Sequence, residues 1–316
     1  MTTPCMIQVA RDDSAAIRRE LLAGLMAPRP SVAPKFLYDV LGSRLFAAIT
    51  ELPEYYPTRT EAAIFTREMA SMARVLGPVR TLVDLGAGDC RKAARLFGAF
   101  GVRRYVAVDI SVDYLRESLG NLQRLHPGMA MLGVGLDFSN DLRLPAEVGE
   151  GPRTLFHPGS SIGNFTPDEA LAFLRQARAA SQGGSLLIGV DLVKPLDVLE
   201  AAYDDPLGVT AAFNRNLLLH FNRLAGTDFA IADWRHVAFF DAEASRIEMH
   251  LEALRDARVR WNGGERRFAA GERIHTENSY KWRIGDFAAL LERAGFSRLT
   301  RWTDEREWFA VFAAAA

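Results

Sequence analysis

Residues 81–88 read Thr-Leu-Val-Asp-Leu-Gly-Ala-Gly, and this stretch is the strongest indication of the fold in the sequence. The first five residues form an apolar run with the length of a buried strand, and the glycines end it. A helix is predicted next, over residues 91–100. Glycine at the end of a strand allows close approach of the backbone to a ligand, because it has no Cβ. The stretch therefore predicts a strand–turn–helix unit of a nucleotide-type sheet.

The same alternation of strand and helix continues to residue 193. A helix is predicted over 114–125, and another begins at Thr166-Pro167, where a hydroxyl cap, a proline and two acids mark a helix start. Strands that alternate with helices predict a parallel, doubly wound sheet. The further strands of this sheet are predicted at residues 104–109, 130–136, 154–157 and 185–193.

The pattern changes after residue 193 and predicts a second module. Helices are expected there over 195–203 and 210–224, before short strands that turns connect. Residues 287–294 are helical again, and a final strand pair is expected to return to the edge of the first sheet. The short strands of the second module are predicted at residues 234–240, 246–254, 259–261 and 267–269.

The segment ahead of the glycine stretch is predicted to be largely helical. A helix is expected over 14–26 and an amphipathic stretch over 43–52. Thr58 and Glu61 have the spacing of a capping box, which predicts a helix start just after Tyr55 and Tyr56.

Composition narrows the possible functions. The 316 residues are 49% hydrophobic, and 38 Lys and Arg nearly balance 39 Asp and Glu, so the general basic surface of a nucleic-acid-binding protein is not expected. The two cysteines and the lack of a long apolar run or a signal-like start favour a cytoplasmic protein that does not enter membranes. The six histidines have no paired helical spacing, so no metal site is predicted.

Acids at successive strand ends predict the cofactor. Asp109 ends the second strand, 21 residues after Gly88, where a carboxylate can accept hydrogen bonds from ribose hydroxyls. Asp137 and Phe138 end the third strand and offer an acceptor for an adenine amino group and a ring to stack on its face. Dinucleotide sites usually need a third glycine at the position of Arg91. S-adenosylmethionine has no phosphates and no such need, so it is the predicted cofactor.

Residues 159–163 read Gly-Ser-Ser-Ile-Gly and match the nucleophile elbow of hydrolases. In a true elbow a helix follows the serine at once, whereas here the best helix start is several residues later, at Thr166. The loop is therefore interpreted as a floor beneath a substrate rather than as a hydrolase site.

Seven stretches together resemble the histidine-specific methyltransferases of ergothioneine biosynthesis, over nearly the full length of the chain. They are residues 35–39 (KFLYD), 52–61 (LPEYYPTRTE), 159–164 (GSSIGN), 202–205 (AYDD), 208–216 (GVTAAFNRN), 246–249 (RIEM) and 276–279 (TENS).

The resemblance implies three methylations of the α-amine of histidine, giving hercynine. It also implies a Rossmann-like class I methyltransferase sheet with a second α+β substrate-binding domain. The expected domains are 58–193 with 283–316 for S-adenosylmethionine, and 1–57 with 194–282 for the substrate.

Site roles follow from the resemblance as well. Asn164 and Tyr203 are expected to bind the carboxylate of histidine, and Tyr38 to orient its amine. The remaining residues expected around the amine and the imidazole are Phe46, Tyr55, Gly159, Met249, Glu277 and Ser279. Those expected to hold the cofactor are Gly86, Lys92, Asp109, Asp137 and Phe138.

Two alternatives remain open at this point: an N-methyltransferase of another aromatic amino acid such as tryptophan, and a cofactor-binding sensor without turnover. Plain structural roles also exist for single residues. Met249 alternates with apolar neighbours as in any strand, Tyr55 could pack ahead of a helix, and Glu277 lies in what reads as a polar loop. A small-molecule substrate and a monomer are expected.

Overall fold

The computed structural model of the protein describes residues 4–9, 14–139 and 141–316. They divide into two compact units. Unit 1 contains the N-terminal strand, Pro57–Val193 and Tyr280–Ala316, and unit 2 contains residues 14–56 and Lys194–Ser279. The predicted lack of a secretory signal concerns residues 1–11, part of which lies outside the described residues.

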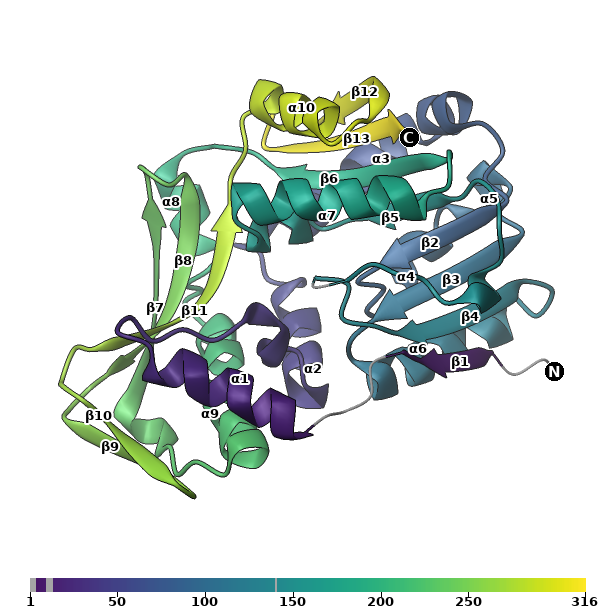
Figure 1. Cartoon of the computed structure of the whole chain (residues 1–316). Coiled ribbons are helices and arrows are strands. Elements are labelled where there is room, and N and C mark those ends of the chain that lie inside the picture. Colours follow the sequence, from purple (N-terminus) through teal and green to yellow (C-terminus); the bar gives the residue numbers. More distant parts are fainter. Residues whose placement is uncertain (1–3, 10–13, 140) are drawn as a thin grey trace. The chain divides into compact units, whose positions relative to one another are not determined.

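Within the described residues, unit 1 has one sheet of eight strands (Figure 1). The first six run parallel, and β13 runs antiparallel to both of its neighbours, β6 and β12. This confirms the predicted doubly wound sheet and the returning strand pair, whereas β1 was not predicted. In spatial order the strands are β1 (Cys5–Gln8), β4 (Ala130–Gly135), β3 (Arg104–Asp109), β2 (Thr81–Leu85), β5 (Thr154–His157), β6 (Ser185–Asp191), β13 (Phe309–Ala315) and β12 (Ser297–Thr303).

Helices cover both faces of this sheet, because its strands are apolar on both sides. In β3, Tyr105 and Ala107 belong to one buried cluster, and Val106 and Val108 belong to another. The cluster with Tyr105 is covered by α3 (Tyr56–Leu76), α4 (Arg91–Ala94), α5 (Phe97–Phe100) and α6 (Val112–Leu125). The cluster with Val106 is covered by α7 (Pro167–Ala180) and α10 (Ile284–Arg293). This period of two is the pattern of a strand buried on both faces.

Two helix predictions in unit 1 are wrong in detail. The single helix expected over residues 91–100 is two short helices, α4 and α5. The helix expected to start at the Thr58 capping box begins earlier, at Tyr56, so Thr58 lies inside its first turn. The cap at Thr166 is confirmed: Thr166 N donates to Glu169 at 2.8 Å and Glu169 N donates to the Thr166 hydroxyl at 3.4 Å.

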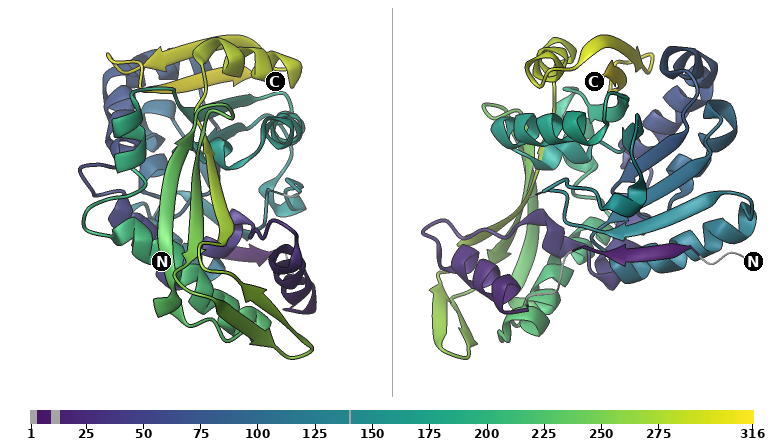
Figure 2. Two further views of the ribbon diagram at one scale, coloured as in Figure 1. Left: turned by 90° about the vertical axis from the view of Figure 1, so that its left-hand side faces the viewer. Right: turned by 45° about the vertical axis from the view of Figure 1, so that its right-hand side comes forward.

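Unit 2 combines helices with short antiparallel sheets, as expected for an α+β module. Strands β11, β8 and β7 lie side by side in one sheet, and β9 pairs with β10 in another (Figure 2). Helix α9 packs against α1, α2 and β7. The elements are α1 (Ser14–Met26), α2 (Val40–Ile49), α8 (Leu196–Ala201), α9 (Val209–Ala225), β7 (Trp234–Asp241), β8 (Arg246–Ala253), β9 (Ala257–Trp261), β10 (Gly264–Phe268) and β11 (Arg273–Tyr280), with short 3-10 turns at Pro34–Leu37 and Ile231–Asp233.

The units differ from the expected domains at three places. Pro57, expected in the substrate-binding domain, belongs to unit 1. β1, expected in the substrate-binding domain, pairs with β4 in unit 1. Residues 280–282 also belong to unit 1, because Trp282 N donates to the carbonyl of Asp191 at 3.0 Å and Lys281 forms a buried ion pair with the Asp191 carboxylate at 2.7 Å. Among the described residues, no helix is long and apolar enough to cross a membrane.

Candidate functional site

The turn after β2 has a backbone geometry that favours glycine. Gly86 and Gly88 have φ angles of +79° and +52°, and the amides of Gly86 and Ala87 donate to the carbonyl of Val108 at 2.9 and 3.1 Å. Among the described residues, a Cβ on Gly88 would meet no atom within 4 Å, and one on Gly86 would meet Phe138 Cζ at 3.7 Å. The turn is therefore fixed by backbone hydrogen bonds and leaves room for a ligand beside it.

Asp109 ties the end of β3 to this turn. Its Oδ2 accepts from Gly88 N and its Oδ1 from Ser111 N, both at 2.9 Å. Burial raises the pKa of Asp109, although these backbone hydrogen bonds act in the opposite direction. Each carboxylate oxygen can accept a further hydrogen bond. The side chain therefore fits the predicted role of a ribose ligand beside the turn.

The end of β4 contributes the next two predicted residues. Asp137 accepts hydrogen bonds from the amide and hydroxyl of Ser139. The Phe138 ring lies beside Gly86 and meets the His157 ring edge-on, with 5.7 Å between centroids. Burial lowers the pKa of His157 to about 4, so its ring is neutral near pH 7 and donates from Nδ1 to the carbonyl of Leu85. A neutral aromatic wall next to the glycine turn suits an adenine ring.

Glu61 is a residue of this site that sequence reasoning assigned wrongly. Its side chain does not cap helix α3 but is almost fully buried and connects two predicted site residues. Oε2 accepts from Lys92 Nζ and Oε1 from Gly159 N, both at 2.7 Å. A Cβ on Gly189 of β6 would lie 2.3 Å from Oε1, so glycine is needed there for Glu61 to fit. No local sequence signal could have revealed partners this distant in the chain.

The Gly159 loop does not have the geometry of a hydrolase nucleophile. A 3-10 turn, Ser161–Asn164, follows β5, and helix α7 starts only at Pro167. The Ser160 hydroxyl accepts from Asp191 N at 2.8 Å, and that of Ser161 donates to the carbonyl of Pro158 at 3.4 Å. Both serines thus hold the loop in place. Asn164 ends the 3-10 turn and is partly exposed.

An aromatic cluster in unit 2 joins four residues predicted to bind the substrate. The Tyr38 and Phe46 rings lie 5.6 Å apart between centroids, Phe46 and Tyr55 6.1 Å, and Tyr55 and Tyr203 6.2 Å, each pair edge-on. Phe213 of α9 packs against Tyr38 at 5.5 Å and was not assigned a role from the sequence. Its place could not be found from the sequence because the cluster draws on separate helices and turns.

One hydrogen bond links this cluster to β11. The Tyr203 hydroxyl and the Ser279 Oγ lie 2.7 Å apart, and both side chains are buried. Either oxygen can donate, so the pair can present both a donor and an acceptor. The pair can therefore donate a hydrogen bond to one polar group of a bound amino acid and accept a hydrogen bond from another.

The last two predicted residues lie in the three-stranded sheet. Met249 of β8 is buried, and its carbonyl accepts from the Thr276 hydroxyl at 3.0 Å. Glu277 was interpreted as part of a polar loop, but it lies in β11 and is only 7% exposed. A buried carboxylate on a strand is held more firmly than one on a loop, which favours a recognition role over a solvated charge.

The predicted site residues divide equally between the two units. Unit 1 holds Gly86, Lys92, Asp109, Asp137, Phe138, Gly159 and Asn164. Unit 2 holds Tyr38, Phe46, Tyr55, Tyr203, Met249, Glu277 and Ser279.

Comparison with known proteins places the chain in a family. The family model described as histidine-specific, SAM-dependent methyltransferase matches residues 17–316. The chain is 41% identical over 312 residues to the histidine N-alpha-methyltransferase of Mycolicibacterium smegmatis, covering 96% of each. It is 30% identical over 298 residues to Ergothioneine biosynthesis protein 1 of Neurospora crassa, covering 89% of this chain and 33% of that protein. It is 24% identical over 341 residues to an L-tryptophan methyltransferase of Psilocybe serbica, covering 95% and 93%.

The glycine turn with its strand-end acids and the buried Tyr203–Ser279 pair agree with the match to the family model over nearly the whole chain. The chain belongs to the family of histidine-specific, S-adenosylmethionine-dependent methyltransferases.

Proposed function

We propose that the protein transfers methyl groups from S-adenosylmethionine to the α-amine of L-histidine. Three successive transfers give hercynine, a step of ergothioneine biosynthesis. Support comes from the near-full-length similarity to a mycobacterial histidine N-alpha-methyltransferase and to an ergothioneine biosynthesis protein. The structural observation that carries the proposal is the buried Tyr203–Ser279 hydrogen bond within the aromatic cluster of unit 2.

S-adenosylmethionine supplies the methyl group, as an electrophilic carbon bonded to a sulfonium. In the proposal, Asp109 binds the ribose hydroxyls and Asp137 the adenine amino group, while Phe138 stacks on the adenine ring. The turn at Gly86 allows the backbone to lie close to the cofactor, since glycine adopts the φ of +79° there without strain and has no Cβ. Glu61 positions Lys92 and the Gly159 amide through its two hydrogen bonds.

Recognition of histidine is assigned chiefly to unit 2. An imidazole has one N–H and one bare nitrogen, and Glu277 can accept from the first while a hydroxyl of Tyr55 or Ser279 donates to the second. Met249 packs on the ring in this proposal. Asn164 and Tyr203 donate to the carboxylate. A pocket that pairs both ring nitrogens should reject rings without them, because its own buried polar groups would be left unpaired.

The amine is methylated by an in-line displacement, so the protein mainly has to align its lone pair and exclude water. We assign the orientation of the nitrogen to the Tyr38 hydroxyl and the Gly159 carbonyl, with each proton leaving to solvent. The nitrogen ends as a quaternary cation, and the rings of Tyr38 and Phe46 can stabilise it by cation–π attraction. This favours acceptance of the partly methylated intermediates.

The substrate is thus a small molecule, and no nucleic acid is part of the proposed reaction. We further propose a monomer in the cytoplasm, where Cys5 and Cys90, which are both free thiols, would stay reduced.

The test is incubation of the protein with S-adenosylmethionine and single amino acids, read by mass spectrometry. L-histidine should gain up to three methyl groups, and its mono- and dimethylated forms should also be consumed. Tryptophan is the alternative substrate to include, because a tryptophan methyltransferase is among the relatives. Methylation of tryptophan but not of histidine would refute the proposal, and binding of the cofactor without any transfer would indicate a sensor.

A further inference from the structure

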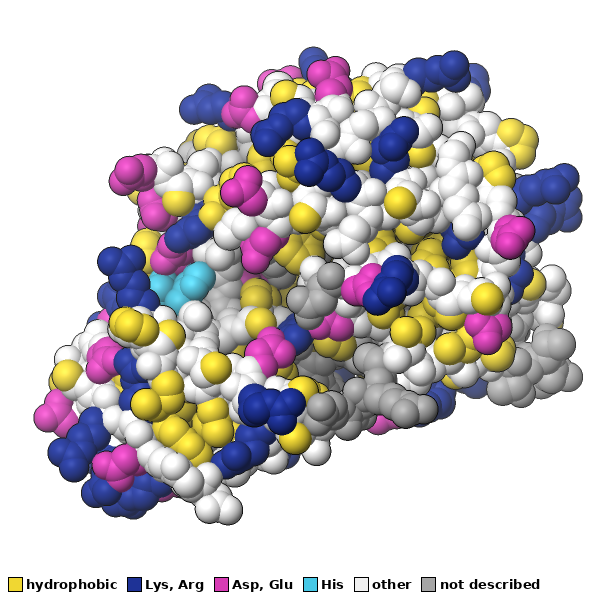
Figure 3. Space-filling model, in the orientation of Figure 1, with side chains coloured by type: hydrophobic (Ala, Val, Ile, Leu, Met, Phe, Trp, Pro, Cys, Tyr) yellow, Lys and Arg dark blue, Asp and Glu magenta, His cyan; other side chains and the backbone are white. Residues whose placement is uncertain are grey.

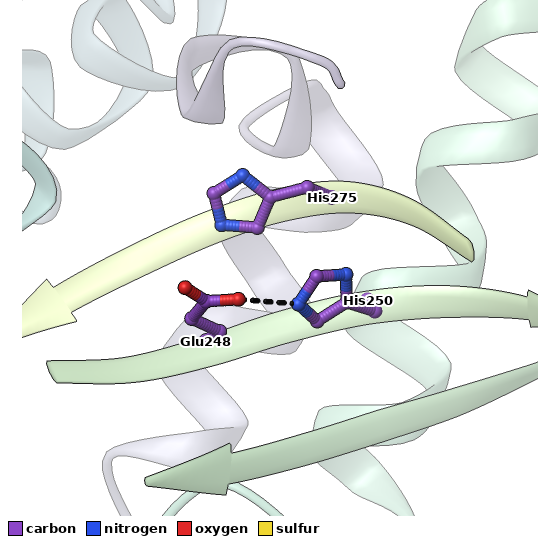
Figure 4. Close-up of side chains that lie close together, drawn as sticks. All are labelled: Glu248, His250 and His275. Carbon is purple, nitrogen blue, oxygen red and sulfur yellow. Dashed lines mark hydrogen bonds and ion pairs between the residues drawn. The ribbon is translucent and has the colours of Figure 1, made fainter. Parts of the chain in front are cut away.

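Three potential metal ligands gather on neighbouring strands of unit 2. Glu248 and His250 lie on β8 and His275 lies on β11, and one ligand atom of each lies within 4.8 Å of the others (Figure 4). The Glu248 Oε2 and His250 Nε2 atoms are 2.8 Å apart, and the two imidazole centroids are 4.9 Å apart. The three side chains point toward one another on the same side of the sheet (Figure 4).

Strand geometry explains why they meet. In β8 the buried residues alternate with Glu248 and His250, which are partly exposed, so both project to the side opposite Met249. In β11, His275 lies between the buried residues Ile274 and Thr276 and is partly exposed like the other two. Sequence spacing gave no sign of this cluster because its histidines are on different strands.

The protonation states suit metal binding. Burial lowers the pKa of His250 and of His275, so both rings are neutral near pH 7 and keep a lone pair. For Glu248, burial raises the pKa, but the hydrogen bonds from His250 and Arg246 more than offset it and the carboxylate is ionised. Two neutral imidazoles and a carboxylate are a ligand set that zinc prefers, with water completing the shell.

The hydrogen bonds of the two imidazoles show which nitrogens would bind a metal. His275 Nε2 donates to the carbonyl of Glu277 at 3.1 Å, which leaves its Nδ1 as the nitrogen with the lone pair. His250 Nε2 faces Glu248 Oε2 at 2.8 Å, so a metal between the three side chains would replace this hydrogen bond and the ring proton would move to Nδ1. That Nδ1 is buried without a hydrogen-bond partner among the described residues, which lowers the expected affinity.

Two arginines limit the affinity. Arg246 Nε donates to Glu248 Oε1 at 2.8 Å, and Arg273 pairs with Glu252 at 2.7 Å. The positive charge of Arg246 lowers the pKa of His275 and that of Arg273 lowers the pKa of His250, so both would also repel a cation. Arg246 competes directly for the carboxylate that a metal needs.

We propose that Glu248, His250 and His275 bind a divalent transition metal of the zinc class. A metal there ties β8 to β11, the strand that carries Glu277. The three side chains are accessible enough for an ion to enter, since none is fully buried. On the face drawn in Figure 3, histidine is exposed beside basic and acidic side chains, although the view does not show which histidine it is. This inference does not depend on the methyl-transfer reaction.

The experiment is titration of the untagged, chelator-treated full chain with Zn²⁺ by calorimetry, and with Co²⁺ by visible absorption. We expect one equivalent per chain. Glu248→Gln, His250→Ala and His275→Ala should each weaken binding by roughly tenfold or more. Arg246→Met should tighten it, because the carboxylate loses its competing partner. Mg²⁺ should not compete, since it prefers oxygen ligands.

His126→Ala is the matched control, because it removes a histidine of unit 1 outside the cluster. Circular dichroism establishes that every variant is folded. Absence of zinc binding in the wild type would overturn the proposal. So would zinc binding that persists at wild-type strength in the three cluster variants, or that weakens in Arg246→Met.

Discussion

Replacement of Glu61 by glutamine tests whether the buried carboxylate positions the cofactor site. The neutral amide can still accept from Gly159 N through its oxygen, but its NH₂ group would face the Lys92 ammonium, and two donors cannot pair. A hydrogen bond to a charged partner contributes about 1.5–3 kcal/mol. The Lys92 side chain is 38% exposed, so solvent weakens the pair and the lower end, about 1.5 kcal/mol, applies. In the variant, cofactor binding has to bring the released Lys92 side chain back into place. If this takes the same free energy from binding, the Kd of the cofactor changes roughly tenfold.

We therefore expect the Kd for S-adenosylmethionine, measured by calorimetry, to rise about tenfold in Glu61→Gln. Glu68→Gln is the control, because Glu68 lies on the same helix and pairs with the exposed Arg67 at 2.8 Å. A double-mutant cycle with Lys92→Met separates the pair from other effects. Glu61→Gln with a folded structure and a Kd within about twofold of the wild type would refute the positioning role.

Three other substitutions give separate tests. Glu277→Ala should lower kcat/KM for histidine by about a hundredfold, because the imidazole N–H loses its buried acceptor, with little change in cofactor Kd; equal losses in both would contradict its assigned role. Tyr203→Phe and Ser279→Ala should each raise the KM for histidine, and the double variant should be less than additive, since the two hydroxyls are hydrogen-bonded; strict additivity would argue against their acting together. Burial raises the pKa of Asp84 to about 7, so its stabilising contribution is present in full below about pH 4 and is lost as the pH rises through 7. Asp84→Asn should accordingly gain Tm relative to the wild type at pH 8.5 but not at about pH 4, in thermal melts at both values; a gain of the same size at both would count against the buried anion.

The strands of unit 1 could be predicted from the sequence because each is a short apolar run with turn residues behind it. β2 and β3 coincide with their predicted bounds, since both faces are buried and the pattern leaves no other solution. β1 was missed because Cys5–Gln8 is only four residues long and partly polar. β11 was missed for a related reason, because the polar run from Glu277 to Ser279 resembles a loop, although Glu277 and Ser279 are buried.

The two capping-box signatures show where sequence reasoning stops. Thr166 and Glu169 form the box, whereas Thr58 and Glu61 have the same spacing and do not. The difference is the environment of the acid: Glu169 is exposed and its best partner is its own helix end, but Glu61 is buried against Lys92 and a loop nearly a hundred residues away. The aromatic cluster of Tyr38 and its neighbours was hidden for the same reason, because long-range packing decides it.

Gly189 has a consequence for how variants of this protein are interpreted. It lies in the middle of the buried strand β6, so a comparison limited to residues that contact a ligand would leave it out. Yet a single added methyl group there would collide with Glu61 and, through it, disturb Lys92 and the Gly159 loop together. Alanine at this position would therefore behave in a genetic screen like the loss of an active-site residue. In a relative with a larger residue there, we expect different residues in place of Glu61 and its partners.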